Sequence, residues 1–206
     1  MKRNDKNALS RQRILDAALH EFAAKGYDGA SLNTVWAENG ISKGIIYHHF
    51  KDKDEIYLLC VEMCFKELTD YLGKAEKTLA GTVEARLQGY FDARLSFFYE
   101  NPLYLGIFFD AALQPPEALI PAIAKLRREF DQLNISVLTG LLCSKPLREG
   151  LSVAAVVEDF GMYMDFFNLR FKNTLHDGLS AESTLIEHEE RCHRQLDILL
   201  HGIFGE

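Results

Sequence analysis

The side chains best suited to chemistry lie in residues 42–49, which read Ser-Lys-Gly-Ile-Ile-Tyr-His-His. Lys43 can donate a hydrogen bond to a phosphate or to a guanine edge, and Gly44 lets the backbone come close to a bound surface. Serine hydroxyls at positively polarised helix amino termini can also donate to phosphates. The donor types therefore predict recognition of a phosphate-rich polymer. The predicted contact residues are Ser31, Ser42, Lys43, Gly44, Ile45, Tyr47, His48, His49 and Lys53.

These donors need helices of defined length to position them. Ser31 and Ser42 are suited to cap two short helices, and Asn39-Gly40 between them tolerates a positive φ. Two short helices joined by a tight turn fit a helix-turn-helix, whose second helix enters the major groove of DNA. A helix over residues 10–25, ended by Gly26, is expected before them, and a capping box at residues 52–55 is expected to open a long fourth helix.

The charge is unevenly distributed along the chain. The whole chain has a net charge of -7, from 23 Lys and Arg against 30 Asp and Glu. Residues 1–53 contain nine basic and six acidic side chains, a net of +3, which leaves 14 basic against 24 acidic side chains, a net of -10, in the rest. Because phosphate contacts need cations only where the duplex lies, this asymmetry indicates a DNA-binding head on a separate acidic body.

Residues 10–55 resemble the tetracycline-repressor (TetR) family. The resemblance rests on three runs, ILDAALHEFAAKGYDGAS, VWAENGISKG and IYHHFKDKDEI. It implies a three-helix DNA-binding head, a variable ligand-binding helical body, and a homodimer formed mainly by the last two helices. The implied function is a ligand-responsive repressor that binds a palindromic operator in double-stranded DNA. The resemblance does not indicate which ligand is bound.

Three residues depart from the family pattern. Trp36 and Asn39 each replace a usual alanine, and Ile45 replaces a usual small or hydroxyl residue. An indole occupies far more volume than a methyl group, so either the head repacks or the Trp36 ring turns outward. Ile45 can contact a thymine methyl if it faces the groove, or pack against the core of the head. The operator sequence therefore cannot be inferred from relatives.

The fold class predicted for the whole chain is all-α. Proline and glycine are few, and apolar residues recur at spacings of three and four. We expect a helix-turn-helix DNA-binding domain over residues 8–55 and a larger helical domain for ligand binding and dimerisation over residues 56–206. The helices expected in the body cover residues 82–98, 102–113, 121–142, 152–175 and 180–204.

Aromatic residues are dense in two stretches of the body. Helical core packing explains any single ring at these spacings. Taken together, rings with a few isolated polar groups fit a mostly apolar pocket for an apolar or aromatic small molecule. The predicted ligand-binding residues are Arg94, Phe97, Phe98, Tyr104, Phe108, Phe109, Tyr163, Phe166 and Phe167, and further polar groups in the same stretches are Asp110, Asp165 and Asn168.

The last helix carries an apolar seam suited to dimerisation. Its members follow steps of seven, four, three and four residues, and Gly161 in the preceding helix can permit close helix approach. The alternative is that the seam belongs to the internal core. The seam residues are Leu185, Cys192, Leu196, Leu199 and Ile203.

Other functions receive weaker support. Cys60 and Cys64, one helical turn apart, leave open a thiol or metal sensor, to which His188, Cys192 and His193 could contribute. A helical protein-interaction adaptor also stays open, and it would bind DNA without steep salt dependence. No catalytic motif is recognised, so neither an enzyme activity nor a cofactor or metal is expected.

The compartment follows from apolar runs and cysteines. The longest apolar stretch, residues 103–113, is too short to span a bilayer. Four scattered cysteines, Cys143 among them, suit reduced thiols in a chain of this size. We therefore expect a cytoplasmic protein without a membrane partner.

Overall fold

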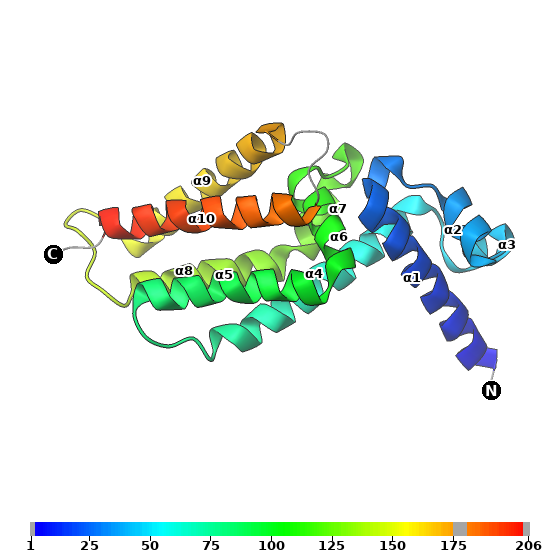
Figure 1. The fold of residues 1–206 in the computed structure, drawn as a ribbon, viewed down its shortest axis with the longest axis horizontal. Helices are drawn as coiled ribbons and strands as arrows, with labels where there is room; N and C mark the ends of the chain where they lie inside the picture. Colours follow the sequence, from blue (N-terminus) through cyan, green and yellow to red (C-terminus); the bar gives the residue numbers. More distant parts are fainter. Residues whose placement is uncertain (1–2, 175–180, 204–206) are drawn as a thin grey trace. The chain divides into compact units, whose positions relative to one another are not determined.

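A computed structural model describes residues 3–174 and 181–203, and its regular elements are helices throughout these ranges (Figure 1). This confirms the all-α prediction. The elements are α1 (Arg3–Gly29), α2 (Leu32–Asn39), α3 (Lys43–His49), α4 (Lys53–Glu76), α5 (Val83–Glu100), α6 (Pro102–Leu113), the 3-10 helix η1 (Glu117–Leu119), α7 (Ile120–Leu126), α8 (Arg128–Leu142), α9 (Val153–Thr174) and α10 (Ala181–Ile203). None of the helices described here is both long and apolar enough to cross a membrane.

The chain forms two compact units. Unit 1 contains Met1–Lys66 and Asn101–Arg127, and unit 2 contains Glu67–Glu100 and Arg128–Glu206. Unit 1 thus combines the helix-turn-helix segment with α6 and α7, which come later in the chain. The functional boundary predicted between residues 55 and 56 stays a prediction.

The core of unit 1 is built on the apolar face of α1. Ile14, Ala18 and Phe22 are almost fully buried, and α1 packs against α2, α3 and α6. Gly26 has a φ of +65°, the expected end of regular helix, although one more helical turn follows before Gly29. Residues at spacings of three and four thus supply the face on which the short helices pack.

Helix α6 packs very closely on α1. A Cβ at Gly106 would lie 2.2 Å from the carbonyl oxygen of Ala23, so a side chain is excluded there. Four residues along α6, the Asp110 carboxylate accepts hydrogen bonds from the Tyr27 N–H at 2.9 Å and from the Tyr57 hydroxyl at 2.6 Å. Burial raises the pKa of Asp110 despite these two donors. Asp110, which sequence reasoning assigned to a ligand pocket, instead joins α6 to α1 and α4.

Unit 2 is a helical bundle in which α5 packs against α8 and α10, and α8 packs against α9 (Figure 1). The single helix expected over residues 121–142 is wrong, because α7 ends at Leu126 and α8 begins at Arg128. Arg127, the single residue between them, has a ψ of -2°, away from the value of about -42° of a regular α-helix. No glycine or proline stands at this break, so the usual sequence signal is absent.

Candidate nucleic-acid interface

The helix-turn-helix predicted from sequence has the caps and turn that it requires. The Ser31 hydroxyl accepts from the Asn33 N–H at 3.2 Å, and the Ser42 hydroxyl accepts from the Ile45 N–H at 3.4 Å. Gly40 adopts the left-handed conformation, with a φ of +62°. The two helices are therefore capped by the predicted serines, and the turn between them uses the predicted glycine.

Helix α3 is anchored by its apolar side and exposes the opposite side. Ile46 is fully buried and Phe50, at the carboxyl-terminal cap, is 2% exposed. The predicted contact residues lie on the outer side or at its edges. Ser42, Lys43, Gly44, Ile45, Tyr47 and His48 are exposed, and Ser31, His49 and Lys53 are half-buried.

Ile45 and Trp36, for each of which the sequence allowed either an inward or an outward placement, both turn outward. Ile45 is 43% exposed, so it does not join the core of the head. Trp36 is half-buried, and its ring lies against the outer face of α3, 6.5 Å from the ring of Tyr47. The indole thus avoids the volume conflict expected at an alanine position. Sequence reasoning identified the conflict but did not include Trp36 among the site residues.

The cations of this region sit over aromatic rings. The Lys43 ammonium lies 5.4 Å from the Trp36 ring centroid, and the Lys53 ammonium lies 4.4 Å from that of Tyr27. Arg11 similarly lies 5.0 Å above the Phe50 ring. Each contact is close enough for a cation–π attraction. The head therefore holds several of its positive charges in defined places at its surface.

His49 differs from these fixed cations. Burial lowers the pKa of the imidazole from 6.5, and the charges of His48 and Arg11 add to the effect. The neutral form of His49 is therefore favoured. In that form it can donate one hydrogen bond to a phosphate but supplies no charge.

Comparison with known families identifies this head. Residues 14–60 match the family described as bacterial regulatory proteins, tetR family. The matched head segment is of the tetR-family type. The matched residues include α2, α3 and the start of α4, so the family match and the helix-turn-helix geometry concern the same segment.

Two curated relatives match the same region. The chain is 39% identical over 62 residues to the biofilm operon icaADBC HTH-type negative transcriptional regulator IcaR of Staphylococcus epidermidis, a match that covers 30% of this chain and 34% of the relative. It is 44% identical over 54 residues to the HTH-type transcriptional repressor AcnR of Corynebacterium glutamicum, covering 26% and 29% respectively. The matched segment thus spans about a third of each relative's length.

Solved structures extend the likeness beyond the head to the fold of nearly the whole chain. A TetR family transcriptional regulator from Chloroflexus aurantiacus has a TM-score of 0.61 at 20% identity, covering 97% of this chain and 95% of the other. The transcriptional regulator FadR from Bacillus subtilis, in complex with stearoyl-CoA, has a TM-score of 0.62 at 17% identity, covering 88% and 96%. At these identities the likeness concerns the fold alone.

The predicted ligand-binding residues fall in both units. Tyr104, Phe108 and Phe109 lie on α6 in unit 1, and the other six belong to unit 2. Most of the rings pack within their own unit. Phe97 and Phe98 are 2% and 1% exposed. Tyr163 stacks on Phe167 at 6.1 Å. Phe166 differs, because it is 60% exposed.

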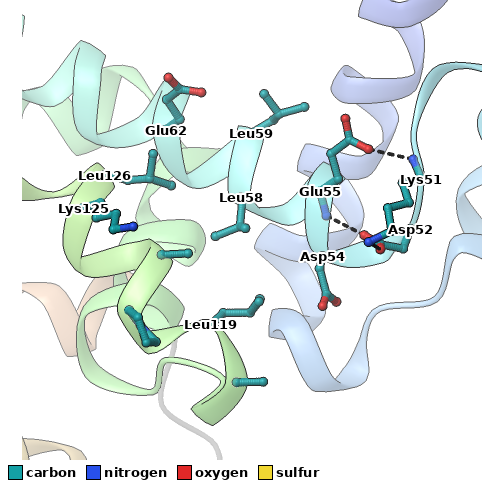
Figure 2. Close-up of a pocket in the computed structure, with 13 residues that line it drawn as sticks. Lys51, Asp52, Asp54, Glu55, Leu58, Leu59, Glu62, Leu119, Lys125 and Leu126 are labelled. Carbon is teal, nitrogen blue, oxygen red and sulfur yellow. Dashed lines mark hydrogen bonds and ion pairs between the residues drawn. The ribbon is translucent and has the colours of Figure 1, made fainter.

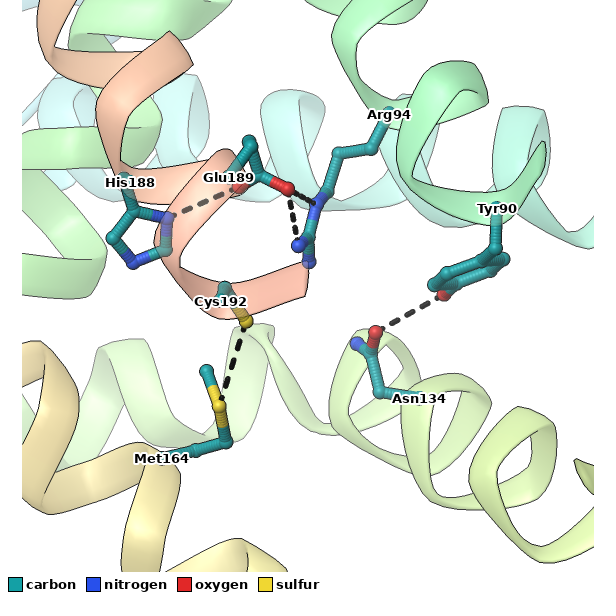
Figure 3. Close-up of polar contacts among 7 residues, drawn as sticks. All are labelled: Tyr90, Arg94, Asn134, Met164, His188, Glu189 and Cys192. Carbon is teal, nitrogen blue, oxygen red and sulfur yellow. Dashed lines mark hydrogen bonds and ion pairs between the residues drawn. The ribbon is translucent and has the colours of Figure 1, made fainter. Parts of the chain in front are cut away.

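Arg94 is engaged within unit 2 by an ion pair. Its Nε donates to the Glu189 carboxylate at 2.7 Å, and one of its terminal nitrogens contacts the same oxygen. His188 lies on the other side of that carboxylate, with its Nδ1 3.1 Å from the second oxygen (Figure 3). Burial alone would raise the pKa of Glu189, but the charge of Arg94 and the His188 contact outweigh burial and lower it. Arg94 is thus neutralised by α10, a partner that the sequence did not reveal.

A groove of about 760 Å³ opens in unit 1 between the start of α4 and α7 (Figure 2). The residues that line it include Leu58, Leu59, Glu62, Lys125 and Leu126. Of the predicted site residues, none lines this groove. The prediction of a pocket among the body's aromatic residues therefore gains no support from it.

Two of the cysteine thiols are held in their protonated form by burial. Cys60 and Cys192 are buried, and burial raises the pKa of each to about 12. Within residues 3–174 and 181–203, no group of three or more His, Cys, Asp and Glu side chains is placed to hold a metal ion. Because the thiolate is the reactive form, the high pKa values disfavour a sensor at Cys60 or Cys192.

Proposed function

We propose that the chain is a cytoplasmic transcriptional repressor that binds a palindromic DNA operator as a homodimer and is released by an apolar or aromatic small molecule. The observation that carries the proposal is the outer side of α3, where Lys43, Ile45 and Tyr47 are exposed beside the helix amino terminus. A cation, a methyl-bearing side chain and a phenol can contact a phosphate, a thymine and the backbone respectively. IcaR and AcnR, which match this segment, are named as negative regulator and repressor.

The DNA-binding proposal predicts a large effect of removing Lys43 and Tyr47 together. On the best duplex selected from random DNA, Lys43→Ala/Tyr47→Ala should bind at least about tenfold more weakly, because each lost contact is worth about 1–3 kcal/mol. Electrophoretic mobility shift measures the affinity, and the slope of log affinity against log salt should fall by about 1 for the lost cation.

Lys125→Ala is the matched control, because Lys125 is an exposed lysine on α7. It should leave affinity and salt slope unchanged. Equal affinity of the folded double variant and the wild type would contradict the proposal. A shallow salt dependence of the wild type would instead favour the protein-interaction adaptor.

The dimer proposal requires an exposed apolar surface on the last two helices. Two of the five residues of the seam predicted on α10, Cys192 and Leu196, are 2% and 5% exposed within the chain, and α10 packs on α5. Leu199 is half-buried, and the side chains of Leu185 and Ile203 lie outside the described part of the structure. Other apolar residues on α9 and α10 are more exposed and can form an interface with a second subunit. Met162 and Phe166, one turn apart on α9, are each 60% exposed, and Ile198 on α10 is 57% exposed. Large apolar side chains at this exposure favour a protein partner.

We expect Met162→Glu/Phe166→Glu to shift the chain from dimer to monomer at micromolar concentration. Two carboxylates would be desolvated in an apolar interface, which should weaken the dimer at least about tenfold. Light scattering after size exclusion measures the mass, and Tyr99→Glu, at an aromatic residue on α5 that is 55% exposed, should stay dimeric. A monomeric wild type, or a dimeric double variant, would refute this interface.

The effector proposal rests on the aromatic residues of the body and on one structural neighbour. FadR of Bacillus subtilis was solved in complex with stearoyl-CoA, an apolar chain on a polar carrier. In this chain Phe97 contacts Tyr71 at 5.4 Å and Phe98 at 5.2 Å, so an apolar ligand would have to replace such ring contacts. We infer a ligand with a large apolar or aromatic part.

Stearoyl-CoA and a panel of apolar aromatic compounds test this inference, with coenzyme A alone as the control. A true effector should raise the unfolding temperature and weaken DNA binding by about 5- to 150-fold, the range of typical coupling free energies. A compound that strengthens the DNA complex would reverse the predicted sign. If no compound changes the unfolding temperature or the DNA affinity, the prediction of an apolar or aromatic effector is wrong.

A further inference from the structure

Lys43 lies beside two neighbouring aromatic rings at the outer surface of the head. Its ammonium lies 5.4 Å from the Trp36 ring centroid and 5.9 Å from that of Tyr47. The two rings are themselves 6.5 Å apart. Both distances from the cation fall within the range of about 6 Å over which ring quadrupoles attract cations. We refer to Trp36, Lys43 and Tyr47 as the aromatic clamp.

The backbone fixes the members of the clamp. Tyr47 follows Lys43 by one turn of α3, so the two share a helix face. Trp36 belongs to α2, and its carbonyl oxygen accepts hydrogen bonds from the backbone N–H groups of Gly40 and Ile41. The left-handed Gly40 therefore ends α2 in a way that ties Trp36 to the turn leading into α3.

The position of Lys43 explains why a clamp is needed. Lys43 is the first residue of α3, where the helix dipole repels a cation, and the first turn of α3 contains no acidic residue. A free lysine side chain also has many rotamers, which must be ordered when it binds. Ring faces supply the missing negative potential and restrict the side chain at the same time.

We propose that Trp36 is a positioning residue for DNA recognition, which with Tyr47 holds the Lys43 ammonium on the outer face of α3 before DNA is bound. This inference rests on the proposed DNA-binding function. It assigns a role to a residue at which the chain departs from the family's usual alanine. In this role Trp36 lowers the cost of ordering Lys43 on binding.

The first test needs no DNA. In the free protein, the ε-methylene protons of Lys43 should show an upfield NMR shift caused by ring currents, and the shift should diminish in Trp36→Leu. Trp36 is the chain's single tryptophan, so intrinsic tryptophan fluorescence reports on it alone. Lys43→Met should change that emission. Unshifted lysine protons in the folded wild type would overturn the clamp.

The second test is a double-mutant cycle on the selected duplex. Trp36→Ala should weaken binding about two- to fivefold, the equivalent of an exposed cation–π contact. The same substitution should have no effect in the Lys43→Met background, because the positioned charge is already absent. Trp36→Phe should retain most of the affinity, and Tyr99→Ala, at an exposed aromatic residue outside the head, should retain all of it.

The outcomes separate this inference from the function on which it rests. A purely structural role of Trp36 predicts equal losses in both Lys43 backgrounds, and such additivity would overturn the positioning role while DNA binding stands. Circular dichroism and the unfolding temperature identify a Trp36→Ala protein that is misfolded, in which case Trp36→Phe and Trp36→Leu take its place in the cycle. If the wild type binds no duplex at all, the proposed function fails and the positioning role fails with it.

Discussion

Replacing Arg94 with methionine is expected to lower the free energy of unfolding by about 3–5 kcal/mol, the usual cost of leaving one member of a buried ion pair without its partner. Arg94 and Glu189 are 8% and 1% exposed, so solvent cannot compensate the stranded carboxylate. The guanidinium also lies 4.8 Å from the Phe91 ring centroid, and this contact is lost as well. Urea unfolding followed by circular dichroism measures the change.

Two control variants show whether burial is responsible. Arg191→Met removes another arginine that pairs with a glutamate, Glu187, on the same helix α10, but the two side chains are 44% and 43% exposed, so the loss should stay below about 1 kcal/mol. Arg94→Met/Glu189→Leu removes both buried charges and should recover much of the lost stability. If Arg94→Met lowered the free energy of unfolding no more than Arg191→Met does, the buried ion pair would be no more stabilising than an exposed one.

The contribution of the same ion pair to stability should depend on pH. Because the pKa of Glu189 is lowered in the folded chain, the pair stabilises the fold above the ordinary value of 4.5 and loses this contribution as pH falls toward the folded pKa. In Arg94→Met the carboxyl keeps its burial but loses the cation, so its pKa should rise. The stability gap between the variant and the wild type should therefore narrow as pH is lowered through 4.5.

Short-range features of this fold were predictable from the residues. Ser31 and Ser42 cap their helices because a hydroxyl needs only the N–H groups two or three residues ahead. At the start of α4 the Asp52 carboxylate accepts from the Glu55 N–H, as a capping box requires. The Glu55 carboxylate, however, accepts from the Lys51 N–H, one residue before the expected partner. Local hydrogen-bonding chemistry thus predicted where these helices are capped, and only the exact partner of the Glu55 carboxylate differed.

Contacts between distant residues were not predictable. Arg94 and Glu189 lie 95 positions apart, and Tyr27 and Asp110 lie 83 apart, so neither pair has a spacing that could signal it. A polar residue among aromatic rings fits a ligand pocket and an internal ion pair equally well. The choice depends on which helix packs opposite, and this is a property of the tertiary fold.

The apolar seam of α10 shows the same limit for hydrophobic patterns. Two of its five residues, Cys192 and Leu196, are buried, but an apolar spacing pattern does not identify what covers such residues. Cys192 and Leu196 are covered within unit 2, where the Cys192 thiol contacts the Met164 sulfur at 3.6 Å. Met162 and Phe166 are both 60% exposed, and of the two only Phe166 had been predicted to have a function, in ligand binding. Burial in the chain therefore decides which apolar residues can serve a second subunit.

Replacing Gly106 with alanine is expected to destabilise the chain by about 3 kcal/mol, because inserting atoms into a closely packed contact forces the backbone to shift. The new Cβ would lie 2.2 Å from the Ala23 carbonyl oxygen and 2.9 Å from two other backbone atoms of Ala23, so no side-chain movement can relieve the clash. Gly73→Ala on α4 is the matched control, since no atom lies within 4 Å of its added Cβ. There the substitution should stabilise the helix by about 0.5–1 kcal/mol.

Urea unfolding of the two alanine variants gives the difference directly, and DNA affinity gives a second readout. Because α1 supports both α2 and α3, a displaced α1 should also weaken binding of Gly106→Ala to the selected duplex, whereas Gly73→Ala should bind as the wild type does. Alanine normally favours a helix over glycine, so any loss at Gly106 occurs against that gain and must come from the contact with Ala23. Equal stability of the two variants would mean that α6 and α1 do not pack as closely as the Gly106 contact requires.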